Sequence, residues 1–372
     1  MLSDASSDPE IRRHTGVGLS RQTLLYELAS KKLRLGNLRG TWNDDHEVVK
    51  TAVAVDGNSL QHASKRLQSD GEIVRIAATN WWSGLSWADE ALRGDRELVL
   101  EAAVAQDGRL LEYASLRLKA DYEIVMKAVS SHGCGLKHAS KALQSNREIV
   151  LAAVTSQGDA LKYASADLQN DRGIVETAIR SSGRALQHAS QELRADSAVV
   201  KAAVDQCWFA FEYADQTLLS NREVVAHAVH RSYSNFTSAS AELKRDPEVI
   251  LSMLTSEHAW SHVLSYIAED ILESNREIAM AAVMMDASSM FRLRAYSNDR
   301  EIALAALTKS RRPCWRSLSH SNFMTDDREI VAAAVALSWE ALKHAGSQFR
   351  NDSELASAAV AQSWHALQHV RH

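Results

Sequence analysis

The sequence predicts an all-α solenoid, an αα-hairpin superhelix of about thirteen 25-residue units after a degenerate N-terminal cap. The first observation behind this prediction is a phrase that recurs through the 372 residues: Asp or Asn, usually any residue, Glu, then Ile or Val. A fixed period of this size is typical of solenoids, in which each unit packs mainly on its neighbours. The phrase begins at Asp45, Asp70, Asp95, Asp121, Asn146, Asp171, Asp196, Asn221, Asp246, Asn275, Asp299, Asp327 and Asp352.

The second observation is that each phrase reads as the start of an α-helix. In the reference unit, residues 146–170, the side chain of Asn146 is expected to cap the first free backbone N–H groups. Glu148 then stands at the positive end of the helix dipole. The apolar residues that follow have the spacing of one helical face: Ile149, Val150, Ala153 and Val154.

A second apolar set predicts a second helix in each unit. Gly158 is expected to end the first helix in a left-handed conformation. The next apolar or small residues again recur at i, i+3, i+4 and i+7: Ala160, Leu161, Ala164, Ser165 and Leu168. Only 3 Pro occur in the chain, and Pro247 falls at the first helical position after Asp246, where a missing N–H costs nothing. Each unit is therefore predicted to be a hairpin of two short helices.

The regularity of the spacing divides the chain into four parts. Residues 1–44 are interpreted as the degenerate cap, because Asp8–Ile11 resembles Asp246–Val249 and residues 28–33 resemble residues 62–67. Residues 45–245 form a regular array, and residues 246–326 form irregular repeats with insertions. Residues 327–372 form C-terminal repeats, of which the last is truncated. The segment 309–326, with Trp315, is either a tolerated loop insertion or a binding elbow.

Composition narrows the functional classes. The net charge of −5 disfavours a general nucleic-acid binder, which would carry a basic stripe. The chain shows neither a secretory signal nor a run of about 18 apolar residues that could span a membrane. Cys134, Cys207 and Cys314 lie far apart without a metal-binding or pairing pattern, which fits a reducing compartment. A cytoplasmic protein without membrane association is expected.

One position in the second arm of each unit is histidine or aromatic, and it invites a metal-binding reading. Equivalent residues of adjacent units are expected to lie roughly 9–10 Å apart, whereas zinc needs ligands about 2 Å from one point. We therefore interpret the position as a half-buried structural ladder and expect no metal and no cofactor; a ridge that binds a partner is the remaining alternative. The position holds His62, Trp87, Tyr113, His138, Tyr163, His188, Tyr213, His344 and His369.

A recurrent serine does not indicate an enzyme. It follows the ladder position by two residues, and its hydroxyl can bond back within its own helix. No GxSxG elbow, HExxH or phosphate-binding loop is present, so no catalytic residue is assigned. The serine recurs at Ser64, Ser115, Ser140, Ser165, Ser190 and Ser240.

The departures from the repeat provide the candidate binding residues. The glycine near the end of the first helix is replaced by large aromatic residues in several units. Such rings either cover gaps between neighbouring turns or form a ridge that binds a partner. The candidates are Trp81, Trp82, Trp87, Trp208, Phe209, Phe211, Trp339 and Trp364.

The unit phrase, clearest in Asn146–Val150 with Leu161–Ser165 and in residues 121–140, resembles the domain of unknown function 4116 family. The resemblance is good over residues 45–240 and acceptable over residues 327–369, while only the helix-start phrase survives in residues 246–326. It implies an α-helical repeat protein and brings no established activity or catalytic residue.

These observations predict a non-enzymatic scaffold or adaptor that binds one or more proteins. One alternative is a helical array that binds nucleic acid with one base per repeat. The other is an enzyme with its site in residues 246–326. Nucleic acid and small-molecule ligands are disfavoured as partners, because the charge balance and the variable exposed positions give little support to a nucleic-acid array and no recognisable acid–base or nucleophile set is found.

Overall fold

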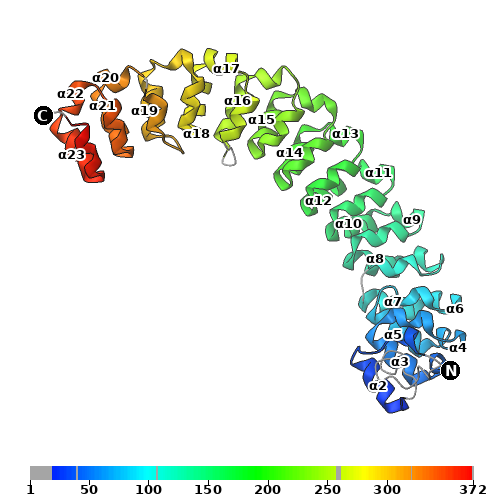
Figure 1. Cartoon of the computed structure of the whole chain (residues 1–372). Helices are drawn as coiled ribbons and strands as arrows, with labels where there is room; N and C mark the ends of the chain where they lie inside the picture. The colour runs from blue at the N-terminus through cyan, green and yellow to red at the C-terminus, as the bar shows by residue number, and fades with distance from the viewer. Residues whose placement is uncertain (1–18, 39–40, 106–107, 257–260, 320, 371–372) are drawn as a thin grey trace, which may run out of the picture. The chain divides into compact units, whose positions relative to one another are not determined.

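The computed structural model describes residues 19–38, 41–105, 108–256, 261–319 and 321–370. The chain divides into two compact units, residues 1–213 (unit 1) and 214–372 (unit 2). The described residues of both units are helical and contain no strand, and the helices recur in tandem (Figure 1). The prediction of an all-α repeat solenoid is confirmed. Residues 8–11, which the sequence assigns to the cap, lie outside the described residues.

Unit 1 contains one row of long α-helices. These are α2 (Arg21–Ala29), α3 (His46–Val55), α5 (Gly71–Asn80), α7 (Arg96–Ala105), α8 (Tyr122–Ser131), α10 (Arg147–Ser156), α12 (Arg172–Ser181) and α14 (Ser197–Gln206). Short α-helices lie between them: α4 (Lys65–Gln68), α6 (Glu90–Arg93), α9 (Lys141–Gln144), α11 (Ala166–Gln169) and α13 (Gln191–Arg194). The 3₁₀ helices are η2 (Leu35–Asn37), η3 (Trp42–Asp44), η4 (Gly57–His62), η5 (Gly84–Trp87), η6 (Gly108–Glu112), η7 (Leu118–Ala120), η8 (Gly133–His138), η9 (Gly158–Tyr163), η10 (Gly183–His188) and η11 (Trp208–Tyr213).

Unit 2 repeats the same elements with more variation. Its α-helices are α15 (Arg222–Arg231), α16 (Pro247–Thr255), α17 (Glu269–Ser274), α18 (Arg276–Met285), α19 (Arg300–Thr308), α20 (Phe323–Asp326), α21 (Arg328–Leu337), α22 (Ser347–Arg350) and α23 (Ser353–Gln362). Its 3₁₀ helices are η12 (Gln216–Ser220), η13 (Tyr233–Ser238), η14 (Leu243–Arg245), η15 (Ser261–Tyr266), η16 (Ala287–Arg292), η17 (Arg294–Tyr296), η18 (Trp315–Leu318), η19 (Trp339–His344) and η20 (Trp364–Gln368).

All thirteen predicted caps stand directly before a long helix. In α10, the Asn146 side chain accepts hydrogen bonds from the backbone N–H groups of Glu148 and Ile149. Asp95 accepts one from Leu98 at 3.0 Å. Pro247 occupies the start of α16, as predicted. Ser20 caps α2 in the same way and stands one repeat length before Asp45, so the repeat phase extends to α2.

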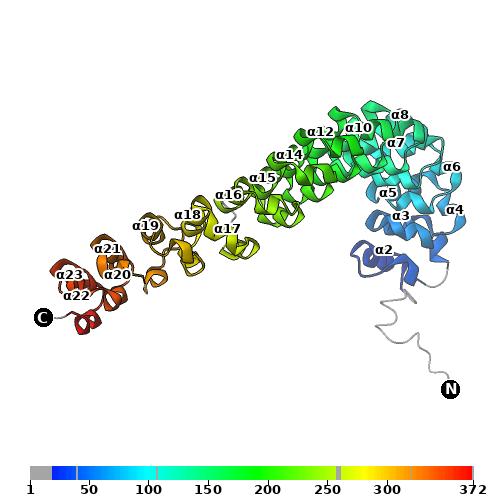
Figure 2. The same ribbon diagram turned by 90° about the horizontal axis from the view of Figure 1, so that it is seen from above.

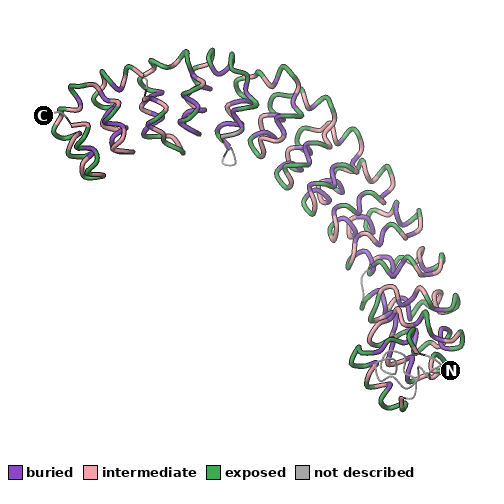
Figure 3. Tube along the Cα trace, viewed as in Figure 1, coloured by how far each residue is buried: buried purple, intermediate pink, exposed green. Residues whose placement is uncertain are grey.

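Each long helix buries the predicted apolar face. In α10 this face is Ile149, Val150, Ala153 and Val154, and in α12 it is Ile174, Val175, Ala178 and Ile179. Helix α10 packs against α8 on one side and α12 on the other. Figures 1 and 2 show α10, α12 and α14 side by side from two directions, and Figure 3 shows buried segments along these long helices.

The second arm of each repeat differs from the predicted α-helix. In the reference unit it is the 3₁₀ helix η9 followed by the one-turn helix α11. Ala164 and Ser165 separate the two with extended backbone, at ψ 157° in both residues. The backbone N–H of Ser165 donates to the carbonyl of Gln144 in the preceding repeat, at 3.0 Å. This break therefore links neighbouring repeats, which an uninterrupted helix would not do.

The recurrent glycine also has a different role from the one predicted. The residue that ends α10, Gln157, is extended, and Gly158 begins η9 without a positive φ. A Cβ on Gly158 would lie 2.3 Å from the carbonyl oxygen of Ala178 in the next long helix. Gly108, Gly133 and Gly183 meet the equivalent carbonyls of Ala128, Ala153 and Ala203. Glycine is thus needed for close approach of neighbouring repeats.

The N-terminal end corrects one sequence comparison. The similarity of residues 28–33 to residues 62–67 predicts a second arm there. Leu28 and Ala29 instead end the long helix α2, and Lys31 follows in a left-handed turn at φ 61°. Leu24 and Leu28 are buried, as are Val49 and Val53 in α3. Similar residues at a different position within the repeat therefore adopt a different conformation.

Candidate functional site

The histidine and aromatic position packs between repeats. The ring at this position lies over a residue at or near the start of the 3₁₀ helix of the preceding repeat. Tyr113 stacks on Trp82 with ring centroids 5.9 Å apart, and His369 stacks on Trp339 at 6.3 Å. Where the preceding residue is Gly36, the His62 ring fills the space that a Cβ would need. Most of these rings are half-buried, although His62 and Trp87 are exposed. The contacts fit the structural ladder inferred from the sequence.

The ladder histidines do not gather into a ligand set. Burial lowers the pKa of His138 and of His188 from the ordinary value, so both are neutral at pH 7. Among the residues that the structure describes, no group of three or more His, Cys, Asp or Glu side chains is placed to hold a metal ion.

At four of its six positions the recurrent serine accepts a bond from the start of the next helix rather than bonding back within one, whereas the hydroxyls of Ser115 and Ser165 are buried without a hydrogen-bond partner. Ser64, Ser140 and Ser190 each accept a hydrogen bond from the backbone N–H three residues later, at the start of α4, α9 and α13. Ser240 accepts the equivalent bond from Leu243 at 3.4 Å. This geometry explains serine by local structure at these four positions.

Ion pairs link the starts of successive long helices, a feature that the sequence reasoning missed. The first residue of a long helix is often Arg, and it reaches the capping Asp of the next repeat. The Nε and Nη2 atoms of Arg21 each donate to the Asp45 carboxylate at 2.9 Å, and Arg147 donates to Asp171 at 3.2 Å. Arg276 holds Asp299 at 2.7 and 3.1 Å and also pairs with Glu301. The sequence carries a signal for these pairs. An Arg recurs directly after a cap, and the capping Asp of the next repeat follows about one repeat length later.

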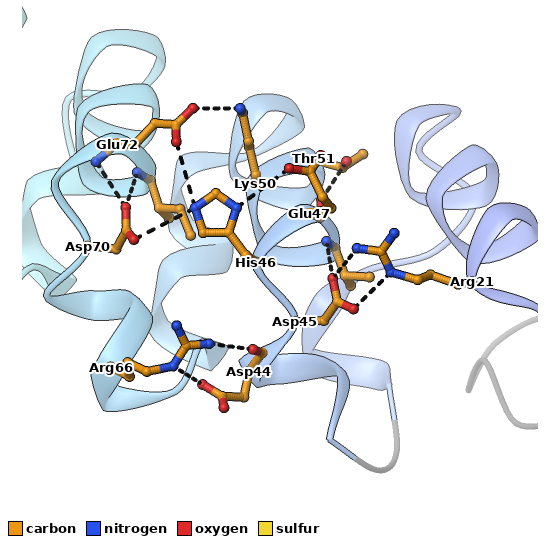
Figure 4. Close-up of polar contacts among 12 residues, drawn as sticks. Arg21, Asp44, Asp45, His46, Glu47, Lys50, Thr51, Arg66, Asp70 and Glu72 are labelled. Carbon is orange, nitrogen blue, oxygen red and sulfur yellow. Dashed lines mark hydrogen bonds and ion pairs between the residues drawn. The ribbon is translucent and has the colours of Figure 1, made fainter.

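At one of these ion-paired junctions between long helices, histidine stands in place of arginine (Figure 4). The His46 ring lies 3.7 Å from both Asp70 and Glu72 of the next repeat. Lys50 pairs with Glu72 at 2.5 Å and stabilises the ionised form of that carboxyl, so the pKa of Glu72 is lowered. All four side chains are partly exposed, and the arrangement serves to join α3 to α5.

We expect the ion pairs between the starts of long helices to make the stability of the fold depend on pH. Arg276 holds the pKa of Asp299 below its ordinary value of 3.8, mainly through their hydrogen bond. Because the folded-state pKa is depressed, this stabilisation is complete above about pH 4 and is lost as pH falls through the folded-state value. Asp299→Asn keeps a capping side chain, as Asn275 does naturally, and removes the charge. Its unfolding midpoint should be slightly lower than that of wild type at pH 7.

Thermal melts at pH 7, 4 and 2.5 measure this difference. The gap between Asp299→Asn and wild type should narrow with acidification and with added salt, because the pair is solvent-exposed and screened. A gap that stays constant over this pH range would contradict the assignment.

The first three candidate residues of unit 1 lie in three different surroundings. Trp82 turns toward the following repeat, where Arg109 lies 4.7 Å above its ring and Tyr113 stacks on it. Trp81 lines a small cavity of about 200 Å³ beside Leu28 and Leu35. Trp87 is exposed on the ladder. Trp81, Trp82 and Trp87 therefore face different neighbours.

The prediction that Phe211 binds a partner is wrong. It is 0 % exposed and belongs to the core, whereas Trp208 and Phe209 are exposed and meet edge to face at 5.5 Å. The repeat register carried the signal, because Phe211 occupies the position of Leu186 and Leu161 in the two preceding repeats, and both leucines are fully buried. Phe209 occupies the position of Arg184 in the preceding repeat, whose guanidinium lies 5.7 Å above its ring.

Unit 2 gathers several rings into one groove, which we name the aromatic groove. It has a volume of about 550 Å³. Five ring-bearing residues line it: Phe291, Trp315, Trp339, His344 and His369. Its other lining residues are polar: Arg316, Ser319, Glu340 and Lys343.

The rings of the aromatic groove come from successive repeats. Phe291 lies in η16 and is 61 % exposed, while Trp315 begins η18 and is nearly buried. The His344 ring packs against Trp315 at 5.4 Å. Of the predicted candidates, Trp339 lines the groove directly. The candidate Trp364 lies next to it, because His365 stacks on Trp364 at 3.9 Å and on Trp339 at 6.1 Å.

The charges of the groove are mostly positive. Arg316 donates to Glu340 at 2.7 Å, and its guanidinium lies 5.7 Å above the Trp315 ring. Lys343 is exposed and has no ion pair among the described residues of the chain. The groove can therefore offer ring faces for packing and cations for an anionic group.

The helices of the structure give no membrane-spanning candidate: within the described residues, none is long and apolar enough to cross a bilayer.

Comparison with known proteins identifies one family. The model of a domain of unknown function (DUF4116) matches five segments, residues 45–93, 95–144, 146–194, 196–244 and 327–372. Together they cover more than half of the chain. The chain belongs to the DUF4116 family. No curated protein and no solved structure matches it.

Each DUF4116 match spans two successive repeats, so the resemblance inferred from the residues is confirmed. The matches leave residues 245–326 uncovered. That segment supplies Phe291, Trp315 and Arg316 to the aromatic groove, while the last match supplies Trp339 and Lys343. The groove thus spans the boundary between the unmatched segment and the last DUF4116 match.

Proposed function

We propose that this DUF4116 protein is a non-enzymatic scaffold or adaptor that binds a protein partner through the aromatic groove of unit 2. The observation that carries the proposal is the convergence of rings from successive repeats beside exposed cations. Trp, Tyr and Arg dominate the binding energy of many protein interfaces, particularly where rings lie in pockets. A cytoplasmic location is part of the proposal and is supported by the three free cysteines, Cys134, Cys207 and Cys314.

The repeats support a binding role for a physical reason. Residues of successive repeats lie side by side although a full repeat separates them in sequence, as Trp315 and Trp339 do. A stacked array therefore presents a continuous surface while its core residues remain unchanged. Changes confined to the surface positions of a few repeats are enough to create a binding site.

Affinity capture from lysate of the source cells tests the proposal. The immobilised full chain should retain specific proteins, and the double variant Phe291→Ala, Trp364→Ala should retain them at least about tenfold less, which corresponds to a loss of about 1.4 kcal/mol. Both side chains are more than 60 % exposed, so the variant is expected to fold. Circular dichroism checks this.

Tyr26→Ala is the matched control, because Tyr26 is an equally exposed ring (65 %) outside the groove. Retention by this control should equal that of wild type. Equal retention by the groove variant, or no retained protein at all, would contradict the proposed function.

A further inference from the structure

We infer that unit 1 binds a phosphate monoester in a pocket between two successive repeats, residues 121–145 and 146–170. This pocket, which we name the lysine pocket, has a volume of about 260 Å³. The inference goes beyond the proposed function, because no residue of the aromatic groove belongs to the lysine pocket. Three lysines and three residues with a hydroxyl group line it: Lys137, Lys141, Lys162, Ser145, Tyr163 and Ser165.

The positive charge of the lysine pocket is not neutralised by the protein. No carboxylate lines the pocket, and none of its three lysines forms an ion pair with the described residues of the chain. Asp159 and Asp167 lie close to Lys162 in the sequence, but neither lines the pocket. The Lys141 ammonium donates to the buried amide of Gln144 at 3.0 Å, which is an uncharged acceptor. The three positive charges are therefore available to a bound anion.

The hydroxyl of Ser165 is buried in this pocket without a hydrogen-bond partner. In two other repeats the corresponding serine donates to an acidic or amide side chain 20 residues earlier, Ser64 to Asp44 and Ser190 to Asn170. The residue 20 positions before Ser165 is Ser145. A buried hydroxyl without a partner is unfavourable, and an anion in the pocket would supply the missing acceptor.

An equivalent junction of the same chain contains a carboxylate at this place. Asp89 precedes the short helix α6 as Ser165 precedes α11, so the two residues correspond. The hydroxyl of Ser69, which corresponds to Ser145, donates to the Asp89 carboxylate at 3.1 Å. The lysine pocket retains the serine of this pair but has no carboxylate of its own. A bound anion would occupy the place that the Asp89 carboxylate has in the earlier junction.

The number of lysines selects an anion with two negative charges. Lys141 is common to both junctions, because it corresponds to Lys65. Lys137 and Lys162 are additional, since the earlier junction has glutamine and serine at their positions. One carboxylate accompanies the junction with one lysine, whereas a phosphate monoester suits three. It carries a charge of about −1.5 to −2 at pH 7 and has three acceptor oxygens for the lysines and the serine hydroxyls.

The buried hydroxyl alone does not make such a site. Ser115 also lacks a hydrogen-bond partner. At its junction, Glu90 and Glu112 occupy the positions that correspond to Lys141 and Lys162. These carboxylates would repel an anion. The lysines and the unpaired hydroxyl coincide only at Ser165 among the recurrent serines of the regular array.

Isothermal titration calorimetry of the full chain tests the inference at a constant ionic strength of about 0.15 M. The probes are glycerol 2-phosphate, N-acetyl-phosphoserine amide and, as the carboxylate, N-acetyl-aspartate amide. Both phosphates should bind saturably, and the aspartate at least about tenfold more weakly. Lys162→Gln should weaken phosphate binding at least about tenfold. Lys127→Gln is the matched control and should bind normally, because Lys127 is an exposed lysine of the same two repeats outside the pocket.

Ser165→Ala is a second variant that does not depend on charge. Its hydroxyl caps no helix, so the unfolding midpoint without phosphate should not fall. Phosphate binding should nevertheless weaken about threefold or more, because a hydrogen bond to a charged group is lost. Tighter binding of the phosphoserine probe than of glycerol 2-phosphate would assign the phosphate to a modified protein chain. The reverse order would assign it to a soluble phosphate ester.

Three results would overturn the inference. Binding of the aspartate probe as tightly as the phosphates would show a general carboxylate site. Equal weakening by Lys162→Gln and Lys127→Gln would show non-specific attraction to the surface. The absence of saturable phosphate binding would show that the pocket has no such ligand. The groove variant Phe291→Ala, Trp364→Ala should bind the phosphates normally, so failure of this inference and failure of the proposed function are distinguishable.

Discussion

Phe211→Ala should destabilise its repeat strongly, whereas truncation of the exposed neighbour Phe209 should not. Phe211 is fully buried in η11, at the position that Leu161 and Leu186 occupy in the two preceding repeats. Truncating a buried phenylalanine removes its transfer free energy and leaves a cavity, at a cost of about 3–5 kcal/mol. A single repeat has few other buried contacts to compensate, because each repeat packs mainly on its neighbours.

Phe209→Ala is the matched control for this prediction. Phe209 is the same residue type two positions earlier, but its side chain is 36 % exposed. Its loss should cost about 1 kcal/mol or less. Hydrogen exchange of the amides in α14 measures both variants on the full chain. Comparable exchange in the two variants would show that Phe211 is not part of the core.

The starts of the long helices could be predicted because their signals are local. An Asp or Asn cap and an apolar face at helical spacing lie close together in the chain, as in Asn146 to Val154, and both features recur in each repeat. The second arm was harder to predict. Apolar residues three apart suit a 3₁₀ helix as well as an α-helix. Leu161 and Leu168 keep a helical spacing, which conceals the extended break at Ala164 and Ser165.

The candidate site could be predicted only in part. Trp339 and Trp364 were identified because an aromatic residue replaces glycine at their repeat position. The aromatic groove as a whole depends on which residues of different repeats come together, and Phe291 and His369 are far apart in the chain. Residues 287–325 also depart from the regular period, so the register that identifies core positions elsewhere was lost there. Comparing Phe211 with Leu186 in register would have prevented the error at that position.

Gly158→Ala should destabilise unit 1 by about 1–3 kcal/mol, although glycine-to-alanine substitutions commonly stabilise helical proteins. The added Cβ would lie 2.3 Å from the carbonyl oxygen of Ala178 and 2.9 Å from the Cβ of Ser182. The first of these atoms is backbone, so relief requires that α12 move away from η9. Such a movement would loosen the packing of the apolar face of α12, which is buried against its neighbours.

Gly71→Ala separates this effect from the general preference of helices for alanine. Gly71 is the first residue of α5, and the nearest atom to an added Cβ is 4.0 Å away, on the Leu92 side chain. Alanine there should be neutral or stabilising by up to about 1 kcal/mol. Urea denaturation followed by circular dichroism compares the two variants with wild type.

If glycine at position 158 served to end α10 in a left-handed turn, alanine would also destabilise the protein. Hydrogen exchange of the amides in α12 and α10 separates this explanation from close approach. Close approach predicts faster exchange in α12 than in α10, and a turn defect predicts the reverse.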